Sequence, residues 1–192
     1  MAVDRMQDRF VVGVTGGSGT ILALRLLENL KSYETHLVIS ENAKKVMAEE
    51  TGFPPERMLS LATYTYDDKD IAAKVSSGSF IFNALVVIPC SISTLGKIAS
   101  GISDTLTTRA CAVALKERRR MVLVPREMPY STIVLENMHK LSLAGAIIAP
   151  ASPGYYTKPK TVDDMVNFIV SRVLDLMGVE NSLIKRWRSG DS

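Results

Sequence analysis

Uninterrupted apolar runs recur along the chain, and between them apolar residues return every three or four positions. Runs without polar alternation are typical of strands that are covered on both faces, as in a parallel sheet. The stretches between them, such as the one with Ile21, Leu24 and Leu27, have the period of an amphipathic helix. The pattern therefore predicts a three-layer α/β/α fold with a parallel sheet. The predicted strands are Phe10–Val14, His36–Ile39, Ala84–Ile88, Met121–Val124 and Ala146–Ile148.

The sequence between the second and third predicted strands is the least regular part of the chain. Residues 52–80 contain Pro54-Pro55 and a polar stretch over residues 64–70, and we expect a long excursion there without a strand. No linker, repeat or low-complexity segment divides the chain. We therefore expect one domain over residues 1–192, with residues 178–192 as a C-terminal tail that packs at a subunit contact.

Three of the apolar runs end in proline, which cannot donate a ladder hydrogen bond and is expected to mark the end of each strand. These prolines are Pro89, Pro125 and Pro150. In an open parallel sheet the ends of all five runs lie along one edge, where such folds bind their ligands. Functional residues are therefore expected along this edge.

The first run ends in a glycine-rich turn, Gly16-Gly17-Ser18-Gly19, that leads into a helix near Thr20. Glycines allow backbone N–H groups and a helix N-terminus to approach an anion closely, which favours phosphate binding. A tight turn without a ligand is the alternative. The motif is neither a Walker loop nor a complete dinucleotide fingerprint, because no GK[ST] follows and Leu22 stands where the last glycine would be.

Hydroxyl side chains follow two further strand ends, at Ser40 and at Ser91-Ile92-Ser93-Thr94. Such hydroxyls cap helices, but they can equally hold the phosphate or ring edge of a cofactor, and the local sequence leaves both open. Cys90 precedes the second group without an evident histidine partner, which favours a small turn residue over a nucleophile.

Several charged residues are candidates for chemistry. Arg109 and Lys116 lie seven residues apart, so they share one helix face, which is either a solvated face or an anion site. Glu50 falls on the apolar face of a helix over residues 41–51, and Arg172 lies between Phe168 and Leu176, so both are expected to point inward. A buried arginine can also form a structural salt bridge.

Glu127 directly follows Arg126 at a strand end, which suggests a general acid or base beside an anion clamp. Tyr156, on the loop after Pro153-Gly154, and Trp187, in the tail, can pack a subunit contact or present their rings to a cationic intermediate. His36 and His139 are expected at the surface or in local hydrogen bonds rather than in catalysis.

Composition excludes several classes of protein. The chain has 192 residues, and its 23 Lys and Arg against 20 Asp and Glu give a net charge of only +3, so we expect no nucleic-acid partner. Two cysteines cannot form a disulfide framework, and no Cys/His cluster has metal-ligand spacing. No apolar run approaches the 18 residues or more of a membrane span, and no signal sequence is recognisable. We expect a cytoplasmic protein without a metal and without a membrane partner.

Taken together, the motifs resemble the flavin prenyltransferase family, formerly labelled 3-polyprenyl-4-hydroxybenzoate or phenylacrylic acid decarboxylases. The resemblance implies a Rossmann-like (flavodoxin-like) flavoprotein that joins a dimethylallyl group from dimethylallyl phosphate to N5 and C6 of reduced FMN. The matching stretches are VTGGSG, SGSF, PCSISTLGKIASG, ALKERRRMVLVPRE, LENM, GAIIAPASPGYY and the helix over residues 163–177. Gly17 stands where the family often has alanine.

The resemblance also implies roles for the candidate residues. The carboxylates Glu50 and Glu127 match those near the flavin N5, Arg109 and Lys116 match basic residues that gather the donor phosphate, and Tyr156 and Arg172 match residues that bind it. Trp187 matches a tail aromatic contributed across the assembly. The residues that match FMN contacts are Gly16, Gly17, Ser18, Ser40, Ser91, Ile92, Ser93, Thr94 and Arg126.

The family further implies a homo-oligomer, a dodecamer, and a decarboxylase that receives the prenylated FMN, as in ubiquinone biosynthesis. With no metal cluster in the sequence, the positive side chains are expected to take the place of magnesium at the leaving group. Glu127 or the released phosphate would remove the proton at C6. Three alternatives remain: an FMN-dependent cysteine-type decarboxylase, a non-catalytic FMN carrier and a NAD(P) reductase.

Overall fold

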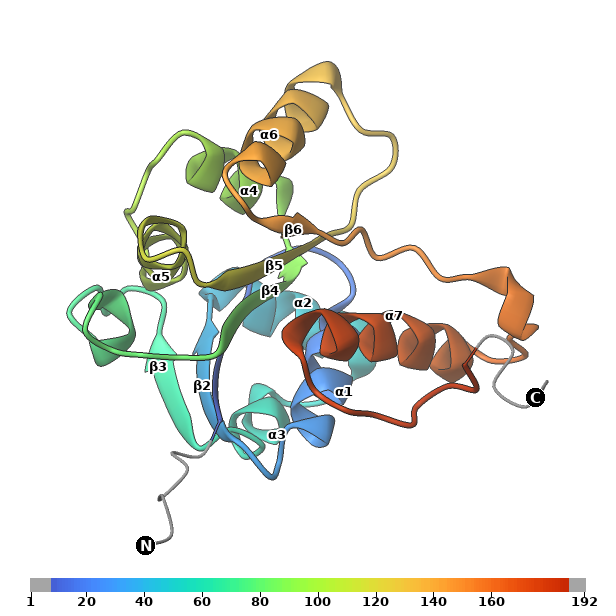
Figure 1. Cartoon of the computed structure of the whole chain (residues 1–192). Helices are drawn as coiled ribbons and strands as arrows, with labels where there is room; N and C mark the ends of the chain where they lie inside the picture. The colour runs from blue at the N-terminus through green and yellow to red at the C-terminus, as the bar shows by residue number, and fades with distance from the viewer. Residues whose placement is uncertain (1–7, 187–192) are drawn as a thin grey trace, which may run out of the picture.

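A six-stranded parallel sheet forms the centre of the molecule in the computed structural model, which describes residues 8–186 (Figure 1). The strands follow the order β3-β2-β1-β4-β5-β6, so β1 and β4 lie side by side at the middle of the sheet. The strands are β1 (Arg9–Val14), β2 (Glu34–Ile39), β3 (Tyr64–Asp67), β4 (Ala84–Cys90), β5 (Arg120–Pro125) and β6 (Ile147–Ile148).

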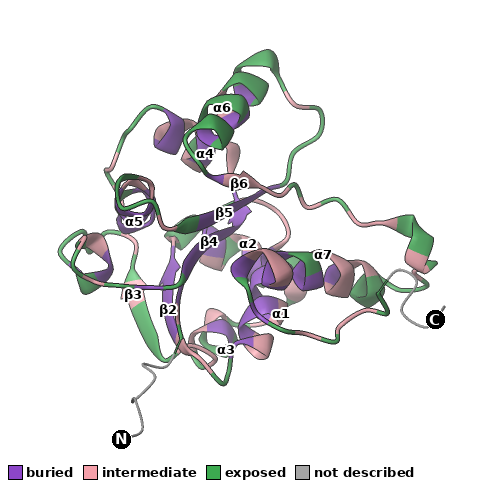
Figure 2. Ribbon diagram, viewed as in Figure 1, coloured by how far each residue is buried: buried purple, intermediate pink, exposed green. Residues whose placement is uncertain are grey.

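Helices cover both faces of this sheet, so the predicted three-layer fold is confirmed (Figures 1 and 2). Successive residues of β1 show why: Val12 packs in the core on one face and Val11 in the core on the other. The first face carries α1 (Thr20–Asn29), α2 (Glu41–Thr51), α3 (Pro55–Leu59) and α7 (Val162–Met177). The second carries η1 (Lys74–Ser76), α4 (Ile92–Ala99), α5 (Leu106–Lys116) and α6 (Thr132–Leu143).

The sheet has one strand more than expected, because β3 lies inside the predicted excursion. Its sequence, Tyr-Thr-Tyr-Asp, is not an apolar run, since β3 is an edge strand with mostly exposed residues. The prediction of no strand there was therefore wrong. The same excursion also contains α3 and η1.

Buried His36 attaches β3 to the sheet. Its Nε2 lies 2.7 Å from the Glu34 carboxylate, which can only accept, so Nδ1 accepts from the Tyr66 hydroxyl at 2.9 Å. The imidazole also stacks on Tyr64, with ring centroids 4.8 Å apart. Burial lowers the pKa of His36 despite its bond to Glu34. His36 is locally hydrogen-bonded, as expected, but it lies in the interior rather than at the surface.

Strand β4 continues through Pro89 to Cys90, although proline was expected to end it. The missing N–H of Pro89 coincides with a register irregularity between Val87 and Cys90, and pairing with β5 resumes where Cys90 faces Pro125. The Pro89 carbonyl accepts from the backbone N–H of Thr15 at 3.2 Å. The strand therefore keeps its direction up to the loop that begins at Ser91.

The chain after α7 turns back along that helix. Gly178, in the left-handed region with φ of +82°, ends α7. Asn181 then contacts Ser171, and Arg186 binds Asp175 through two hydrogen bonds of 2.7 and 3.0 Å. The part of the predicted tail that contains Trp187 lies outside the described residues, and the single-domain boundaries remain a prediction. No helix within residues 8–186 is long and apolar enough to cross a bilayer.

Candidate active site

The ends of β1 and β4 meet at the middle of the carboxyl edge, and buried Thr15 joins them. Its hydroxyl donates to the Pro89 carbonyl at 2.9 Å and accepts from the Ser91 backbone N–H at 2.7 Å. Thr15 thereby fixes the glycine loop against the start of α4. Thr15 was not among the residues expected at the site. In the sequence it is marked only as a polar residue between an apolar run and a glycine turn.

The glycine loop is closely packed. A Cβ on Gly16 would lie 2.8 Å from Asn42 Cβ, so only glycine fits there without movement. A Cβ on Gly17 would lie 3.4 Å from Pro89 Cβ, which is an ordinary contact. Gly19 caps α1 with a left-handed φ of +103°. The predicted turn from strand to helix is present, and its role in phosphate binding stays a prediction.

The Glu50 carboxylate occupies the N-terminus of α1. It accepts from the backbone N–H groups of Gly19 at 2.9 Å and of Thr20 at 3.3 Å, and from the Thr20 hydroxyl at 3.2 Å. Partial burial raises the pKa of Glu50, but hydrogen bonds from Ser18, Gly19 and Thr20 outweigh it, so the pKa lies below its ordinary value.

Glu50 does not point into the core, so that prediction was wrong. The residue is exposed, and its side chain extends along the surface from α2 to α1. The helical period gave the correct face, because Ala43 and Met47 of that face are buried. However, Glu50 is in the last turn of α2, beyond the part of the helix that the core covers. The carboxylate still has the polar partners that we expected it to need.

Ser40 and Ser91 are both helix N-caps. Ser40 accepts from the Ala43 N–H at 3.2 Å, and Ser91 from the Thr94 N–H at 3.2 Å. The Ser91 hydroxyl also donates to Thr94 Oγ1 at 2.9 Å. The capping interpretation is thus confirmed for both serines, whereas the cofactor interpretation of Ser91 to Thr94 is untested. Ser93 is exposed.

Arg126 and Glu127 follow β5 at the same edge and are exposed. Glu127 Oε1 accepts from the Met128 backbone N–H at 3.1 Å. Partial burial raises the pKa of Tyr130, and the negative charge of Glu127 adds to this effect while Arg126 opposes it. Pro125 lies opposite Cys90 in the sheet. Arg126 and Glu127, which follow Pro125, therefore leave the sheet beside Ser91, which follows Cys90.

Arg109 and Lys116 are exposed on one face of α5, as their spacing predicts. Arg109 is in the first half of the helix, whereas Lys116 is its last residue, roughly 10 Å further along the axis. Lys116 forms a salt bridge of 2.9 Å with Glu117 and lies beside Gly78, near the start of β5. Lys116 is therefore remote from the carboxyl edge of its own sheet.

Tyr156 and Arg172 belong to the other face of the sheet, with α7. Tyr156 packs edge-on against Phe168, with ring centroids 5.7 Å apart, and a Cβ on Gly154 would lie 2.6 Å from that ring. The Arg172 guanidinium binds Asp175 at 2.7 Å, and 54% of the Arg172 side chain is exposed. The prediction that Arg172 points inward was wrong, since its long side chain bends to the surface pair.

A single chain thus brings together only part of the predicted site. The carboxyl edge collects Gly16 to Gly19, Ser40, Glu50, Ser91 to Thr94, Arg126 and Glu127. Helix α5, which carries the exposed Arg109 and Lys116, packs on one face of the sheet, and α7 with Arg172 packs on the other. Trp187 lies outside the described residues.

Two further expectations concern the cysteines and metal ligands. Burial raises the pKa of the Cys90 thiol to about 12, which agrees with a packing residue and opposes a nucleophile, although Cys90 lies in a strand rather than a turn. Both cysteines are free. Among residues 8–186, no three His, Cys, Asp or Glu side chains are grouped so that they could hold a metal ion.

Comparison with known proteins assigns this arrangement to a class. The family model described as Flavoprotein matches residues 3–174, so the chain is a flavoprotein of the α/β kind. Flavin prenyltransferase UbiX of Thermoplasma acidophilum is 62% identical over 179 residues, which are 93% of this chain and 99% of that protein. The chain therefore belongs to the flavin prenyltransferase family.

Solved structures agree with this assignment. AnUbiX (PadA1) in complex with FMN and dimethylallyl pyrophosphate is 41% identical, with a TM-score of 0.94 over 96% of this chain and 99% of that one. A dodecameric FMN-dependent UbiX-like decarboxylase from Escherichia coli O157:H7 is 45% identical, with a TM-score of 0.92 over 94% and 100%. An FMN-dependent cysteine decarboxylase, TvaF, shares only 18% identity, and this likeness shows the fold alone.

Proposed function

We propose that this protein transfers a dimethylallyl group from its phosphate ester to N5 and C6 of reduced FMN, and so produces prenylated FMN. The main support is the carboxyl edge, where Glu50, fixed on the N-terminus of α1, lies beside the loop that Thr15 joins to Ser91. This places a carboxylate and capping hydroxyls at the central strands β1 and β4, which is where an open sheet binds its ligand.

The residues of this edge fit FMN. Gly16 and Gly17 carry no Cβ, so the loop between β1 and α1 packs closely against Asn42 and Pro89 and stays at the carboxyl edge where FMN would bind. Hydroxyl and N–H donors suited to a phosphate or a ring edge surround the loop. The residues that would hold FMN are Gly16, Gly17, Ser18, Ser40, Ser91, Ile92, Ser93, Thr94 and Arg126.

When bound, reduced FMN supplies the nucleophilic N5 and the C6 position. The protein would orient it, keep water away from the allylic cation and move protons. Glu50, held ionised by α1, would interact at N5. Glu127 or the released phosphate would accept the proton from C6.

Departure of the phosphate requires positive charge at the leaving oxygen. Arg109 and Lys116 on one face of the sheet, and Tyr156 and Arg172 on the other, would converge only if different protomers contribute them. We therefore propose a homo-oligomer, a dodecamer like the E. coli relative, in which subunit contacts complete each site. Trp187 would be contributed across such a contact.

Product formation tests the proposal directly. Protein incubated anaerobically with reduced FMN and dimethylallyl phosphate should yield a flavin that is heavier by one five-carbon group in mass spectrometry. Unmodified flavin from folded, FMN-bound protein would contradict the proposal.

A non-catalytic FMN carrier would behave differently under substitution. Glu127→Gln and Lys116→Ala should each reduce adduct formation by about 10²-fold or more if the protein is an enzyme, whereas a carrier would form no adduct in the wild type and would lose little of its FMN binding in the variants. FMN binding, followed by flavin fluorescence, should change little in both variants. Delivery to a recipient decarboxylase, a role in ubiquinone biosynthesis and a cytoplasmic location remain predictions.

A further inference from the structure

The Asp175 carboxylate, in the last turn of α7, accepts hydrogen bonds from three side chains. Its Oδ1 accepts from Arg186 Nη2 at 2.7 Å and from Asn181 Nδ2 at 3.1 Å. Its Oδ2 accepts from Arg186 Nη1 at 3.0 Å and from Arg172 Nη1 at 2.7 Å. Arg172 lies three residues earlier on α7, whereas Arg186 belongs to the C-terminal segment that returns along this helix. Two guanidinium groups therefore share one carboxylate.

This cluster carries one net positive charge, because Asp175 is held in its ionised form. A hydrogen bond from Arg186 lowers the pKa of Asp175 more than partial burial raises it. The charges of Arg186 and Arg172 lower this pKa further, so it lies below its ordinary value. One negative charge, on a side chain that is only 18% exposed, is thus set against two positive charges.

The two arginines bind Asp175 differently. Arg186 uses two nitrogens of its guanidinium, one for each carboxylate oxygen, which is the strong bidentate form. Arg172 uses Nη1 alone, and its other N–H groups donate to no acceptor within residues 8–186. Because Asp175 keeps its bidentate partner, Arg172 can turn towards another anion without leaving the carboxylate unpaired.

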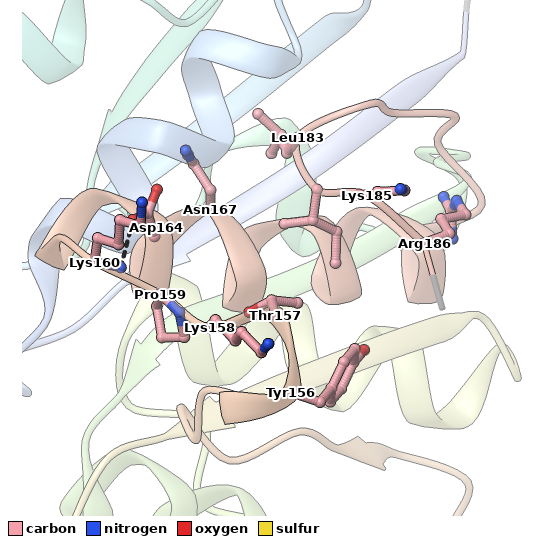
Figure 3. A pocket seen from close by; sticks show the side chains of 11 residues that line it. Tyr156, Thr157, Lys158, Pro159, Lys160, Asp164, Asn167, Leu183, Lys185 and Arg186 are labelled. Atoms are coloured by element: carbon pink, nitrogen blue, oxygen red, sulfur yellow. Dashed lines mark hydrogen bonds between the residues drawn. The ribbon is translucent and has the colours of Figure 1, made fainter. Parts of the chain in front are cut away.

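The cluster lies beside the residues expected to bind the donor. Phe168 is one turn before Arg172 on α7, and the ring of Tyr156 packs edge-on against Phe168, so Tyr156 and Arg172 share one side of the helix. Tyr156 and Arg186 also line the same cavity, of about 480 Å³, between the 3₁₀ turn η2 (Tyr155–Thr157) and the returning segment (Figure 3). The C-terminal segment thus reaches Asp175 next to the expected donor site.

We propose that Arg186 is a positioning residue, which neutralises Asp175 and so leaves the charge of Arg172 available for the phosphate of the dimethylallyl donor. The inference rests on the proposed function, since it assumes that Arg172 binds this phosphate. Without Arg186, Arg172 would be the only cationic partner of Asp175 within residues 8–186, and the pair would be neutral. An incoming phosphate would then compete with Asp175 for the same guanidinium.

Donor affinity in single and double variants tests the proposal. Calorimetry on full-length protein loaded with oxidised FMN measures the binding of dimethylallyl phosphate without turnover. Arg186→Gln should weaken this binding by roughly fivefold, because Asp175 then holds Arg172. Asp175→Asn should leave binding unchanged or tighten it, because the competing carboxylate is gone. The double variant should bind within about twofold of the wild type, since it lacks both the competitor and the residue that neutralises it.

These opposite effects exclude a merely structural role. Either substitution removes the ion pair between α7 and the C-terminal segment, so a role in holding that segment would weaken binding equally in both single variants. A direct contact between Arg186 and the phosphate would leave the double variant as weak as Arg186→Gln. Either result would overturn the proposal. Arg57→Gln is the matched control, since it removes an arginine paired with Glu28 from α3 and should not change donor affinity.

Product analysis of the same proteins with reduced FMN separates this inference from the proposed function. If the wild type forms adduct but the double variant does not regain donor affinity, the positioning role of Arg186 fails and the prenyltransferase remains. If the affinities follow the expected order but no adduct forms, the role of Arg186 in donor binding stands and the proposed activity fails.

Discussion

Glu50 is a carboxylate whose partner is a helix end rather than a basic side chain. Its bonds to Gly19 and Thr20 place negative charge where the dipole of α1 is positive, and they hold the side chain at the glycine loop. The carboxylate can therefore stay ionised at neutral pH beside a bound flavin. An ionised Glu50 agrees with the role proposed for this residue at the flavin N5.

Replacing Glu50 by Gln should separate binding from chemistry. The amide keeps the size of the side chain, so FMN affinity should change by less than about threefold, while adduct formation should fall by about 10²-fold. Fluorescence titration and mass spectrometry measure the two quantities. An equal loss of FMN affinity and of adduct formation would indicate that Glu50 stabilises the glycine loop and takes no part in the reaction.

Gly17→Ala should stabilise the protein. The added Cβ meets Pro89 at an ordinary 3.4 Å, and alanine restricts the unfolded chain, so the free energy of unfolding should rise by about 0.4–1 kcal/mol. Gly16→Ala is the contrasting variant, because its Cβ would lie 2.8 Å from Asn42, and it should lower stability by about 1–3 kcal/mol. Thermal melting compares the two, and the reverse order would contradict the packing described for the loop.

Sequence periodicity assigned Glu50 and Arg172 to the apolar faces of their helices but did not predict the direction of their side chains. Glu50 and Arg172 were both expected inside, because each falls on an apolar face. Both are long, and each reaches a surface partner: the N-terminus of α1 for Glu50, and Asp175 for Arg172. Periodicity assigns a Cβ to a face, but the charged end several bonds away follows its electrostatic partner.

At the scale of elements, the attachment of β3 depends on one buried histidine. The Glu34 carboxylate, whose pKa is lowered to about 2 by Arg9, holds the imidazole, which in turn binds Tyr66 on β3. The folded state favours neutral His36, so protonation stabilises the unfolded chain relative to the folded one. The contribution of neutral His36 to the free energy of unfolding should be complete above the ordinary histidine pKa of about 6.5. It should decrease as the pH falls below that value.

His36→Gln should flatten this pH dependence. At pH 7.5 the variant should be less stable by about 1 kcal/mol, since glutamine replaces the two hydrogen bonds imperfectly. Between pH 7.5 and 5.5, its melting temperature should fall less than that of the wild type. His139→Gln, at the exposed histidine of α6, is the control and should keep the wild-type slope. If the melting temperature of His36→Gln fell with pH as steeply as that of the wild type, His36 would be excluded as the source of the pH dependence.

Most of the elements could be predicted because the buried strands consist of uninterrupted apolar residues. All five predicted runs are strands of the sheet, and the helix over residues 41–51 has the expected bounds. The edge strand β3 could not be found in this way, because one side of it lacks a neighbour and its residues are polar or aromatic. Its position depends on His36 and Tyr66, which are 30 residues apart in sequence.

At the scale of the whole molecule, the sheet separates the two groups of residues expected to bind the donor. Arg109 and Lys116 belong to the layer with α5, and Arg172 to the layer with α7. The motif order in the sequence correctly indicated the family, but one sequence does not indicate which copy supplies each side chain. That depends on surfaces that only the assembly brings together.

Mixed oligomers test whether the site is shared. Lys116→Ala and Arg172→Ala should each abolish most adduct formation as pure assemblies. After dissociation and joint reassembly, a fraction of the sites would receive both intact residues from different protomers, so activity should return to roughly a quarter of wild type if the residues act pairwise across one contact. Mixing without dissociation is the control. Activity that never recovers would place all these residues in one protomer.

If neighbouring protomers supply the donor-binding residues, as proposed, while the glycine loop and its serines belong to one chain, then loss of turnover need not be accompanied by loss of flavin. On dilution, a protomer released from its neighbours would keep its isoalloxazine but become inert. Specific activity should then vary with enzyme concentration, whereas the yellow colour of each chain would not.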